Sequence, residues 1–280
     1  MLRRSRLAAA LVVLVAFGGL PAASATAAAR PKAGPVRVTA AFDRAASLGG
    51  TTALDVDLQL DPRRLPMAPL TSVELEYPQS LGLVSSGLGL AVCTRPASDF
   101  AQVLITGPRL GGCPPNAVMG YGTARALVRL VGDGQVIPEY ATVTLLSGPL
   151  VHGRLGLVVF VDGERPFGAK LAFAGEVRGA AAPYGGTLAM RMPVIPGLED
   201  VAVVSLVELR IVIGSPAIRY YERRRGRVVA YRPAGVALPA HCPAHGFRFR
   251  ARVAFADGTR HWAATTSPCP RAVVAPPTGR

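Results

Sequence analysis

The sequence predicts an all-β protein: an antiparallel β-sandwich, or a barrel-like form of it, with two disulfides. Three observations lead to this fold class. Short segments in which apolar and polar residues alternate recur along the chain, and Gly, Pro, Asp and Asn separate them. No window combines helical periodicity with capping residues. The chain also holds 4 cysteines, an even number that suits disulfides in an exported protein.

Residues 1–25 have the three parts of a secretory signal peptide. A basic start, "MLRRSR", precedes the apolar run "LAAALVVLVAFGGL". At about 14 residues this run is too short to span a bilayer well. Ala23-Ser24-Ala25 then supplies the small side chains of a cleavage site. We therefore expect cleavage after Ala25 and a secreted protein, extracellular or associated with the cell wall, with no transmembrane segment left after cleavage. The alternative is an uncleaved anchor.

Beyond the signal peptide, the pattern predicts one β-sandwich domain over residues 36–270. A Pro/Gly linker over 26–35 precedes it, and a tail over 271–280 has no pattern to pack and is expected to be disordered. The segment 201–213 is apolar at nearly every position, which is typical of a central strand. The other strands expected before the last hairpin are 52–60, 72–77, 122–130, 140–146, 154–161, 169–177 and 187–192.

The segment 246–265 predicts the last hairpin, because Asp257-Gly258 is a strong signal for a two-residue turn. That turn sets Trp262 opposite Val253, on the apolar face, and His261 on the other face. Alternation divides the first strand between an apolar face, formed by Phe247, Phe249, Ala251, Val253 and Phe255, and a basic face, formed by Arg248, Arg250 and Arg252.

The same register predicts how the cysteines pair. It sets Cys269 opposite Gly246, a few residues from Cys242, and a disulfide needs Cα atoms about 4.4–6.8 Å apart. Cys93 and Cys113 close a local loop that is rich in turn residues. Four cysteines allow three connectivities. The two sequence-local bridges, Cys93–Cys113 and Cys242–Cys269, are the simplest of them.

The histidines beside Cys242 raise an alternative. His241, Cys242 and His245 have the atoms to hold zinc, with Cys269 or His261 as a fourth ligand. In an exported protein, however, cysteines more often form a bridge, and the expected register sends His261 to the solvent face. We therefore predict no metal site and no cofactor.

The formal charge at pH 7 is +14, and nearly all the positive charge is arginine, since lysine occurs only at Lys32 and Lys170. Such a charge favours polyanionic partners, although this composition is also typical of a GC-rich genome. One candidate site is the basic face of the last hairpin. The other is "YYERRRGR" (220–227), where tyrosines adjoin arginines and whose alternative is a solvated hairpin loop. The candidate residues are Arg248, Arg250, Arg252, Arg223, Arg224 and Arg225.

The sequence contains no motif for nucleophilic, metalloprotease or phosphate-binding chemistry, so we predict no catalytic residue. A glycosidase or a calcium site would instead need clustered carboxylates. The carboxylates available are Asp55, Asp57, Asp61, Glu74 and Glu76. Strand alternation alone explains their spacing, which favours solvated strand faces. The isolated His152 is expected in a turn.

Three segments carry a resemblance: "CPPNAVMGYGTARA" (113–126), "GGTLAMRMP" (185–193) and "HCPAHGFRFRARVAFADG" (241–258), followed by a closing Cys-Pro. From Val73 to Pro270 the chain resembles a group of uncharacterised exported proteins of high-GC Gram-positive bacteria. The resemblance implies an exported β-sandwich with disulfides. It implies no activity and no functional residue.

These observations predict a monomeric or weakly associating protein of the cell envelope, with a binding or structural role and no enzymatic activity. Its expected partner is an anionic envelope polymer, bound through an arginine-rich face, and no specific nucleic acid. The alternative is an extracellular carbohydrate-active hydrolase that uses carboxylates between Asp55 and Glu76.

Overall fold

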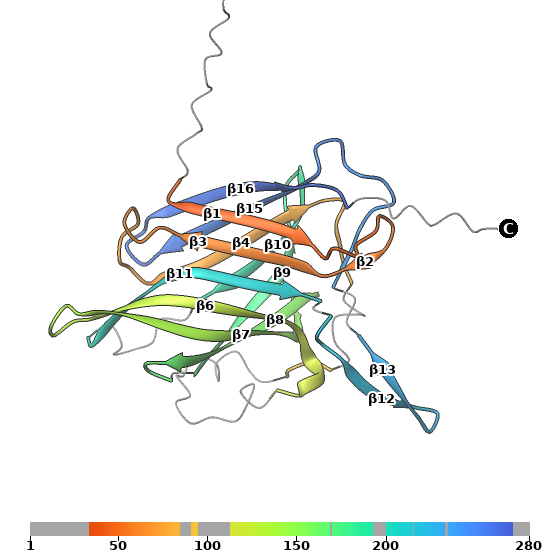
Figure 1. Ribbon diagram of the computed structural model, residues 1–280, viewed down its shortest axis with the longest axis horizontal. Helices are drawn as coiled ribbons and strands as arrows, with labels where there is room; N and C mark the ends of the chain where they lie inside the picture. Colours follow the sequence, from red (N-terminus) through yellow and green to blue (C-terminus); the bar gives the residue numbers. More distant parts are fainter. Residues whose placement is uncertain are drawn as a thin grey trace, which may run out of the picture. The chain divides into compact units, whose positions relative to one another are not determined.

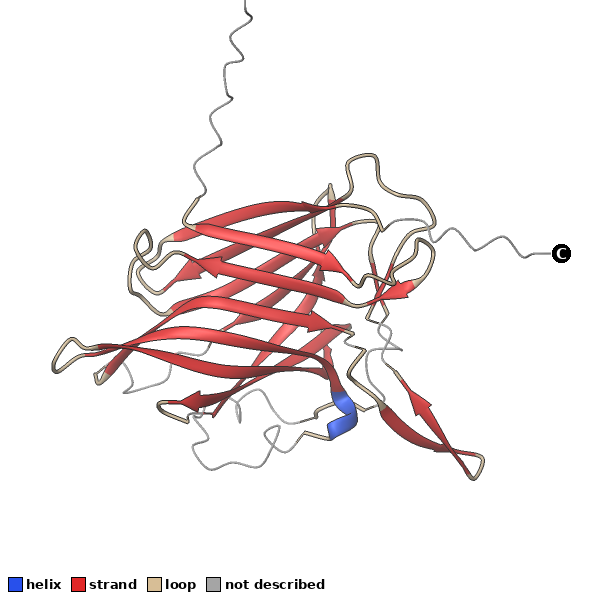
Figure 2. Ribbon diagram, in the orientation of Figure 1, coloured by secondary structure: helices blue, strands red, loops and turns tan. Residues whose placement is uncertain are grey.

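The described residues fold as antiparallel β-structure, as the alternation predicts (Figure 2). The computed structural model describes residues 34–84, 91–94, 113–168, 170–192, 200–214, 216–232 and 235–270. Within these ranges the only helical element is a short 3-10 turn, η3 (Pro115–Ala117). The predicted signal peptide, most of the predicted linker and the predicted tail lie outside them.

Most strands belong to one large sheet. Its strands are β1 (Val36–Phe42), β3 (Leu54–Leu60), β4 (Leu70–Pro78), β6 (Val118–Leu130), β7 (Val136–Val151), β8 (Arg154–Arg165), β9 (Lys170–Gly179), β10 (Tyr184–Arg191), β11 (Ala202–Ile213), β15 (Phe247–Phe255) and β16 (Arg260–Ser267). Their order across the sheet is β1-β3-β11-β6-β7-β8-β9-β10-β4-β15-β16 (Figure 1). β11 lies between β3 and β6, which confirms the prediction of a central strand there.

The two edge strands, β1 and β16, lie alongside each other, so the sheet nearly closes into a barrel (Figure 1). Since the 11 strands pair antiparallel throughout, the two edges run in the same direction, and they are not hydrogen-bonded neighbours. Side chains bridge this seam instead. Phe42 of β1 packs edge-to-face on Phe247 of β15, with the ring centroids 4.8 Å apart.

One face of each strand fills the barrel interior with buried apolar side chains. Phe247 and Phe249 of β15, with Leu54 of β3 and Leu145 of β7, are among the largest of them, and none is more than 2% exposed. Burying a side chain of this size contributes about 1.5–3 kcal/mol. The interior of the described barrel is therefore a packed core.

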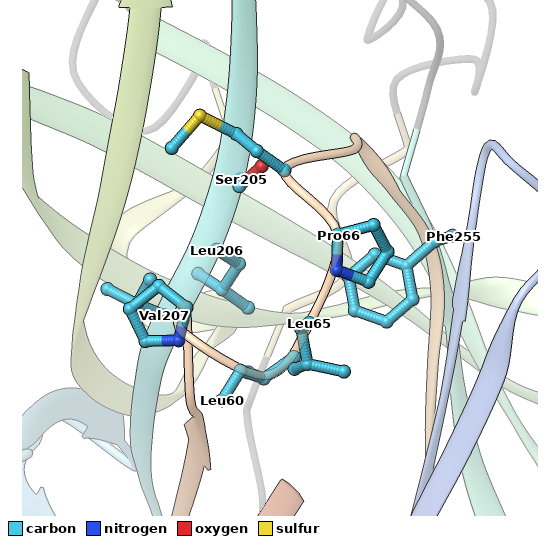
Figure 3. A pocket seen from close by; sticks show the side chains of 9 residues that line it. Leu60, Leu65, Pro66, Ser205, Leu206, Val207 and Phe255 are labelled. Atoms are coloured by element: carbon cyan, nitrogen blue, oxygen red, sulfur yellow. The ribbon is translucent and has the colours of Figure 1, made fainter. Parts of the chain in front are cut away.

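The loop between β3 and β4 packs across one end of the barrel (Figure 3). Leu65 and Pro66 of this loop and Phe255 of β15 line a cavity of about 10 Å³ there. Ser205 of β11 donates a hydrogen bond to the carbonyl of Ala68 at 3.1 Å, which fastens the loop to the sheet.

A small sheet lies against the same core. It consists of β2 (Thr51–Thr52), β14 (Val236–Ala237) and β5 (Gly82–Leu83), and Val236 is fully buried in the core cluster. Two cavities of about 20 and 30 Å³ remain between the inward side chains, and their lining exposes no polar surface. Such volumes are on the order of one or two waters, so the described cavities hold no space for a ligand.

A second apolar cluster covers the opposite face of β7, β8 and β9. Leu146, Val158 and Phe160 pack there with Cys93 and Cys113, apart from the barrel core. Where this cluster covers them, around residues 143–147, 157–160 and 172–173, these strands are buried on both faces. This explains why residues 157–161 are apolar at consecutive positions.

Both predicted disulfides are confirmed. The Cα atoms of Cys93 and Cys113 lie 4.9 Å apart, and those of Cys242 and Cys269 lie 6.0 Å apart. The first bridge is buried in the second apolar cluster, whereas Cys242 is exposed.

The turn of the last hairpin is one residue longer than predicted. Ala256, Asp257 and Gly258 form a three-residue loop, because the amide of Gly258 donates to the carbonyl of Phe255 and the amide of Phe255 donates to the carbonyl of Thr259. Gly258 has φ +85°, the left-handed conformation that this turn type requires. The prediction of a two-residue turn was wrong.

The extra loop residue shifts the register by one, so each side chain of β16 lies on the face opposite to the predicted one. Arg252 pairs with Trp262 and Val253 pairs with His261, so the predicted positions of Trp262 and His261 were wrong. Trp262 lies on the arginine face and is 67% exposed. His261 packs edge-on against Phe255, with the ring centroids 6.2 Å apart.

Candidate functional site: arginine-rich surfaces outside the barrel

The basic face of β15 points outward, as predicted. Arg248 and Arg252 are exposed, and Arg250 is half-buried. The neighbouring strand β4 places Glu76 opposite Arg250 and Glu74 opposite Arg252. Two of the three predicted cations therefore face carboxylates on the adjacent strand.

Glu76 forms ion pairs with both Arg250 and Arg252, and its single negative charge offsets one of their two positive charges. Its side chain is 7% exposed, and its two oxygens accept a hydrogen bond from Arg250 Nε and pair with Arg252 Nη2 at 3.2 Å. This hydrogen bond raises the pKa of the Arg250 guanidinium above its usual value. The guanidinium also lies over the ring of Tyr184, 4.7 Å from the centroid. Arg248 is the member of the face that forms no ion pair within the described residues.

The second candidate site is a hairpin outside the large sheet (Figure 1). It consists of β12 (Tyr220–Arg224) and β13 (Arg227–Tyr231). Arg225 and Gly226 form its turn and both have positive φ, +49° and +77°, as a type I′ turn requires. The segment 219–232 holds six arginines and one glutamate. We call it the arginine hairpin.

The outer part of the arginine hairpin is accessible to solvent on all sides. Every residue from Arg223 to Ala230 is exposed. Arg223, Arg225 and Arg227 form no ion pair within the described part of the chain. Apolar side chains accompany them: Tyr221, Val228 and Val229, which are 67%, 63% and 46% exposed.

The base of the arginine hairpin is fixed to the second apolar cluster. Tyr220 is buried there beside Ile218, its ring is stacked with that of Tyr231 at a centroid distance of 6.4 Å, and its hydroxyl donates to the carbonyl of Val118. Burial raises the pKa of Tyr220, and the charges of nearby tyrosines add to the effect. Burial also raises the pKa of Tyr231, against the opposing charge of Arg224. A fixed base thus carries an exposed basic tip.

Four of the five carboxylates of the hydrolase alternative lie on two strands that are not neighbours: Asp55 and Asp57 on β3, and Glu74 and Glu76 on β4. Asp55 pairs with Arg210, with Nε 3.1 Å from Oδ1, and Glu74 pairs with Arg178. Asp57 accepts a hydrogen bond from Gln59. Each of these carboxylates has a basic or amide partner, and no pair of them is joined by a hydrogen bond within the described residues.

Two further predicted positions lie in turns. Asp61 accepts the amide of Arg63 at 3.0 Å in the loop that crosses the barrel end. His152 has φ +51° and connects β7 to β8, as expected for a turn residue.

Cys242 and Cys269 are bonded to each other in a disulfide, so neither supplies a thiolate ligand for zinc. No cluster of three or more potential metal ligands occurs among the described residues. In the same residues, no helix has the length and hydropathy to cross a membrane.

Sequence reasoning missed three residues of these surfaces. Arg227 stands in the quoted basic motif and pairs across the turn with Arg224, which the Arg-Gly turn signal could have revealed. Arg178 pairs with Glu74, which lies opposite Arg252, and Tyr184 lies against Arg250 itself. Both residues are distant from β15 in the sequence. No local pattern indicates such contacts.

Comparison of the chain with protein-family models, with curated proteins and with solved structures found no match. The fold and the two arginine-rich surfaces are therefore the basis for a functional proposal.

Proposed function

We propose that this protein is an exported, non-catalytic component of the cell envelope that binds an anionic polymer through the arginine hairpin. The observation that supports this most is the exposure of Arg223, Arg225 and Arg227 without carboxylate partners among the described residues. A protein does not need free cations on a projecting hairpin for its own folding. They suit an external anion.

The arginine hairpin fits the proposal better than the basic face of β15. There Glu76 already pairs with Arg250 and Arg252, and an anion that drew both arginines away would leave an almost buried carboxylate without a partner. Planar guanidinium groups bind phosphate with two hydrogen bonds each. Phosphate-rich polymers are therefore the expected partners.

Two properties support an exported location. The sequence begins with the features of a signal peptide, and the two disulfides suit an oxidising compartment.

The test measures binding of the purified mature protein to polyphosphate and to a polyol-phosphate polymer over a salt series. Releasing counterions from about four phosphate contacts gives a log–log salt slope of about −3 for a flexible polyanion. The triple variant R223Q/R225Q/R227Q is expected to lose most of the affinity and to flatten this slope. The matched control is R37Q/R129Q/R191Q, which removes the same charge from exposed strand positions.

Equal loss in both triple variants would show that net charge alone binds the polymer and would overturn the proposal. So would tight binding by the hairpin variant. Anionic vesicles form a third arm, because Tyr221, Val228 and Val229 are exposed beside the arginines. Binding to vesicles but to neither polymer would reassign the hairpin to a membrane surface.

A further inference from the structure

Trp262 is the single tryptophan of the chain, and it lies on the outer surface of the barrel. Its side chain is 67% exposed, although a tryptophan can bury a large apolar area. It belongs to β16, beside β15 (Figure 1). Folding of the described chain thus leaves this indole largely in solvent.

The strands around Trp262 carry a regular pattern of charges. Arg252 lies directly opposite it on β15, and Glu74 lies opposite Arg252 on β4. In the next row, Ala264, Arg250 and Glu76 follow in the same order. One row therefore reads aromatic, cation, anion, and a small alanine occupies the corresponding position of its neighbour.

These charges are held in place. Arg252 pairs with Glu76 at 3.2 Å, Arg250 binds the same carboxylate, and Glu74 pairs with Arg178 of β9. The side chains are fixed by strands rather than by loops, so a ligand need not order them on binding.

We propose that Trp262 and the paired charged side chains beside it, Arg250, Arg252, Glu74 and Glu76, form a carbohydrate-binding site. In this site a neutral sugar ring stacks on the indole. A flat indole matches the apolar face of a pyranose ring. Sugar hydroxyls both donate and accept hydrogen bonds, as guanidinium and carboxylate groups in one row require. Glu74 and Glu76 offset part of the positive charge of the arginines around them, so this surface is less basic than the tip of the arginine hairpin.

The salt dependence of binding distinguishes this site from the arginine hairpin. Binding of a neutral ring releases few counterions, so it depends little on salt, whereas polyanion binding by the hairpin weakens steeply. A protein with both sites would hold a wall polymer through its sugars and its anionic groups separately.

The single tryptophan makes the test direct. The mature protein is titrated with neutral oligosaccharides of glucose and of N-acetylglucosamine, with polyphosphate and with single-stranded DNA, while Trp262 emission is followed. A saturable change with a neutral oligosaccharide is expected, at low and high salt alike. The hairpin variant R223Q/R225Q/R227Q is expected to keep this response, which separates failure of one site from failure of the other.

Calorimetry then compares variants, since W262A has no tryptophan emission. W262A is expected to weaken oligosaccharide binding by at least about tenfold, as truncation of an aromatic hot spot does, and W262F to retain part of it. The matched control is Y121A, which removes another exposed aromatic, 46% exposed, from β6. No emission change with any neutral oligosaccharide, a response to DNA alone, or equal loss in W262A and Y121A would each overturn the inference.

Discussion

The hydroxyl of Tyr220 donates a hydrogen bond to the backbone carbonyl of Val118, the first residue of β6. This contact joins the start of the arginine hairpin to the wall of the barrel, although 102 positions separate the two residues. It lies in the second apolar cluster, beside the Cys93–Cys113 bridge. The position of the basic tip therefore depends on a buried phenol.

Replacing Tyr220 by phenylalanine is expected to lower the free energy of unfolding by about 1 kcal/mol, since the carbonyl of Val118 loses its donor. Urea titration near neutral pH measures this change. Y221F is the control, because Tyr221 follows Tyr220 in β12 and is 67% exposed. If Y220F is as stable as the wild type, this hydrogen bond does not fix the hairpin base.

Stability is also expected to fall at alkaline pH. Burial raises the pKa of Tyr220 above the ordinary value of 10.0, so the folded state holds the phenol proton more tightly than the unfolded state. The resulting stabilisation is complete below about pH 10 and is lost as the pH rises toward the folded pKa. Y220F should show a smaller loss. Some loss will remain, because the pKa values of Tyr77 and Tyr231 are raised as well. Identical alkaline profiles would contradict this assignment.

Glu76 is expected to be the most sensitive carboxylate of the outer surface. E76Q leaves Arg250 and Arg252 without their shared anion and should cost about 2 kcal/mol, as loss of a hydrogen bond to a charged group does. E176Q is the matched control, because Glu176 pairs with Arg154 at 3.9 Å and both partners are more exposed. Chemical denaturation of both variants measures the loss in the free energy of unfolding. Equal losses would show that burial of Glu76 is energetically unimportant.

The two disulfides should differ in their reduction. Cys242 is exposed, whereas Cys93 is completely buried, so a mild reductant should open Cys242–Cys269 first. Loops of 20 and 27 residues predict that each bridge stabilises the fold by about 3 kcal/mol. Alkylation during timed reduction, followed by peptide mapping, gives the order. Prior loss of Cys93–Cys113 would mean that its cluster opens readily.

Cleavage after Ala25 remains a prediction from the sequence. N-terminal sequencing of protein recovered from the medium or the envelope should begin at Thr26. Recovery of the chain with Met1 intact would contradict it and favour the uncleaved anchor.

Much of the fold could be predicted because strand alternation is local. Leu54, Val56 and Leu58 point inward and Asp55 and Asp57 outward as a direct consequence of the pleat. The short separation within each cysteine pair similarly favoured the two observed bridges. The faces of these β3 side chains and the disulfide pairing could therefore be predicted from residues near each other in sequence.

The register of β16 against β15 could not be predicted from the local turn signal alone. Asp257-Gly258 fits both a two-residue and a three-residue hairpin loop, and the choice between them moves Trp262 from one face to the other. In the folded chain the three-residue loop keeps the inward face of β15 in the core and leaves Trp262 outside. The candidate carbohydrate site therefore could not be found from the sequence.

The class of fold, the inward face of most strands, both disulfides and the basic character of two segments were predictable from the sequence. Which arginines are exposed without a carboxylate partner among the described residues depends on how the strands are arranged in space. Arg250 meets Glu76 across 174 positions of the chain, because β4 and β15 become neighbours only when the barrel forms. The arginine hairpin lies outside that sheet, so no adjacent strand of the barrel supplies carboxylates to its tip. The alternation of apolar and polar residues determines locally which face of the sheet a side chain lies on. Its partner on the adjacent strand depends on the order of the strands, which results from packing between residues far apart in the sequence.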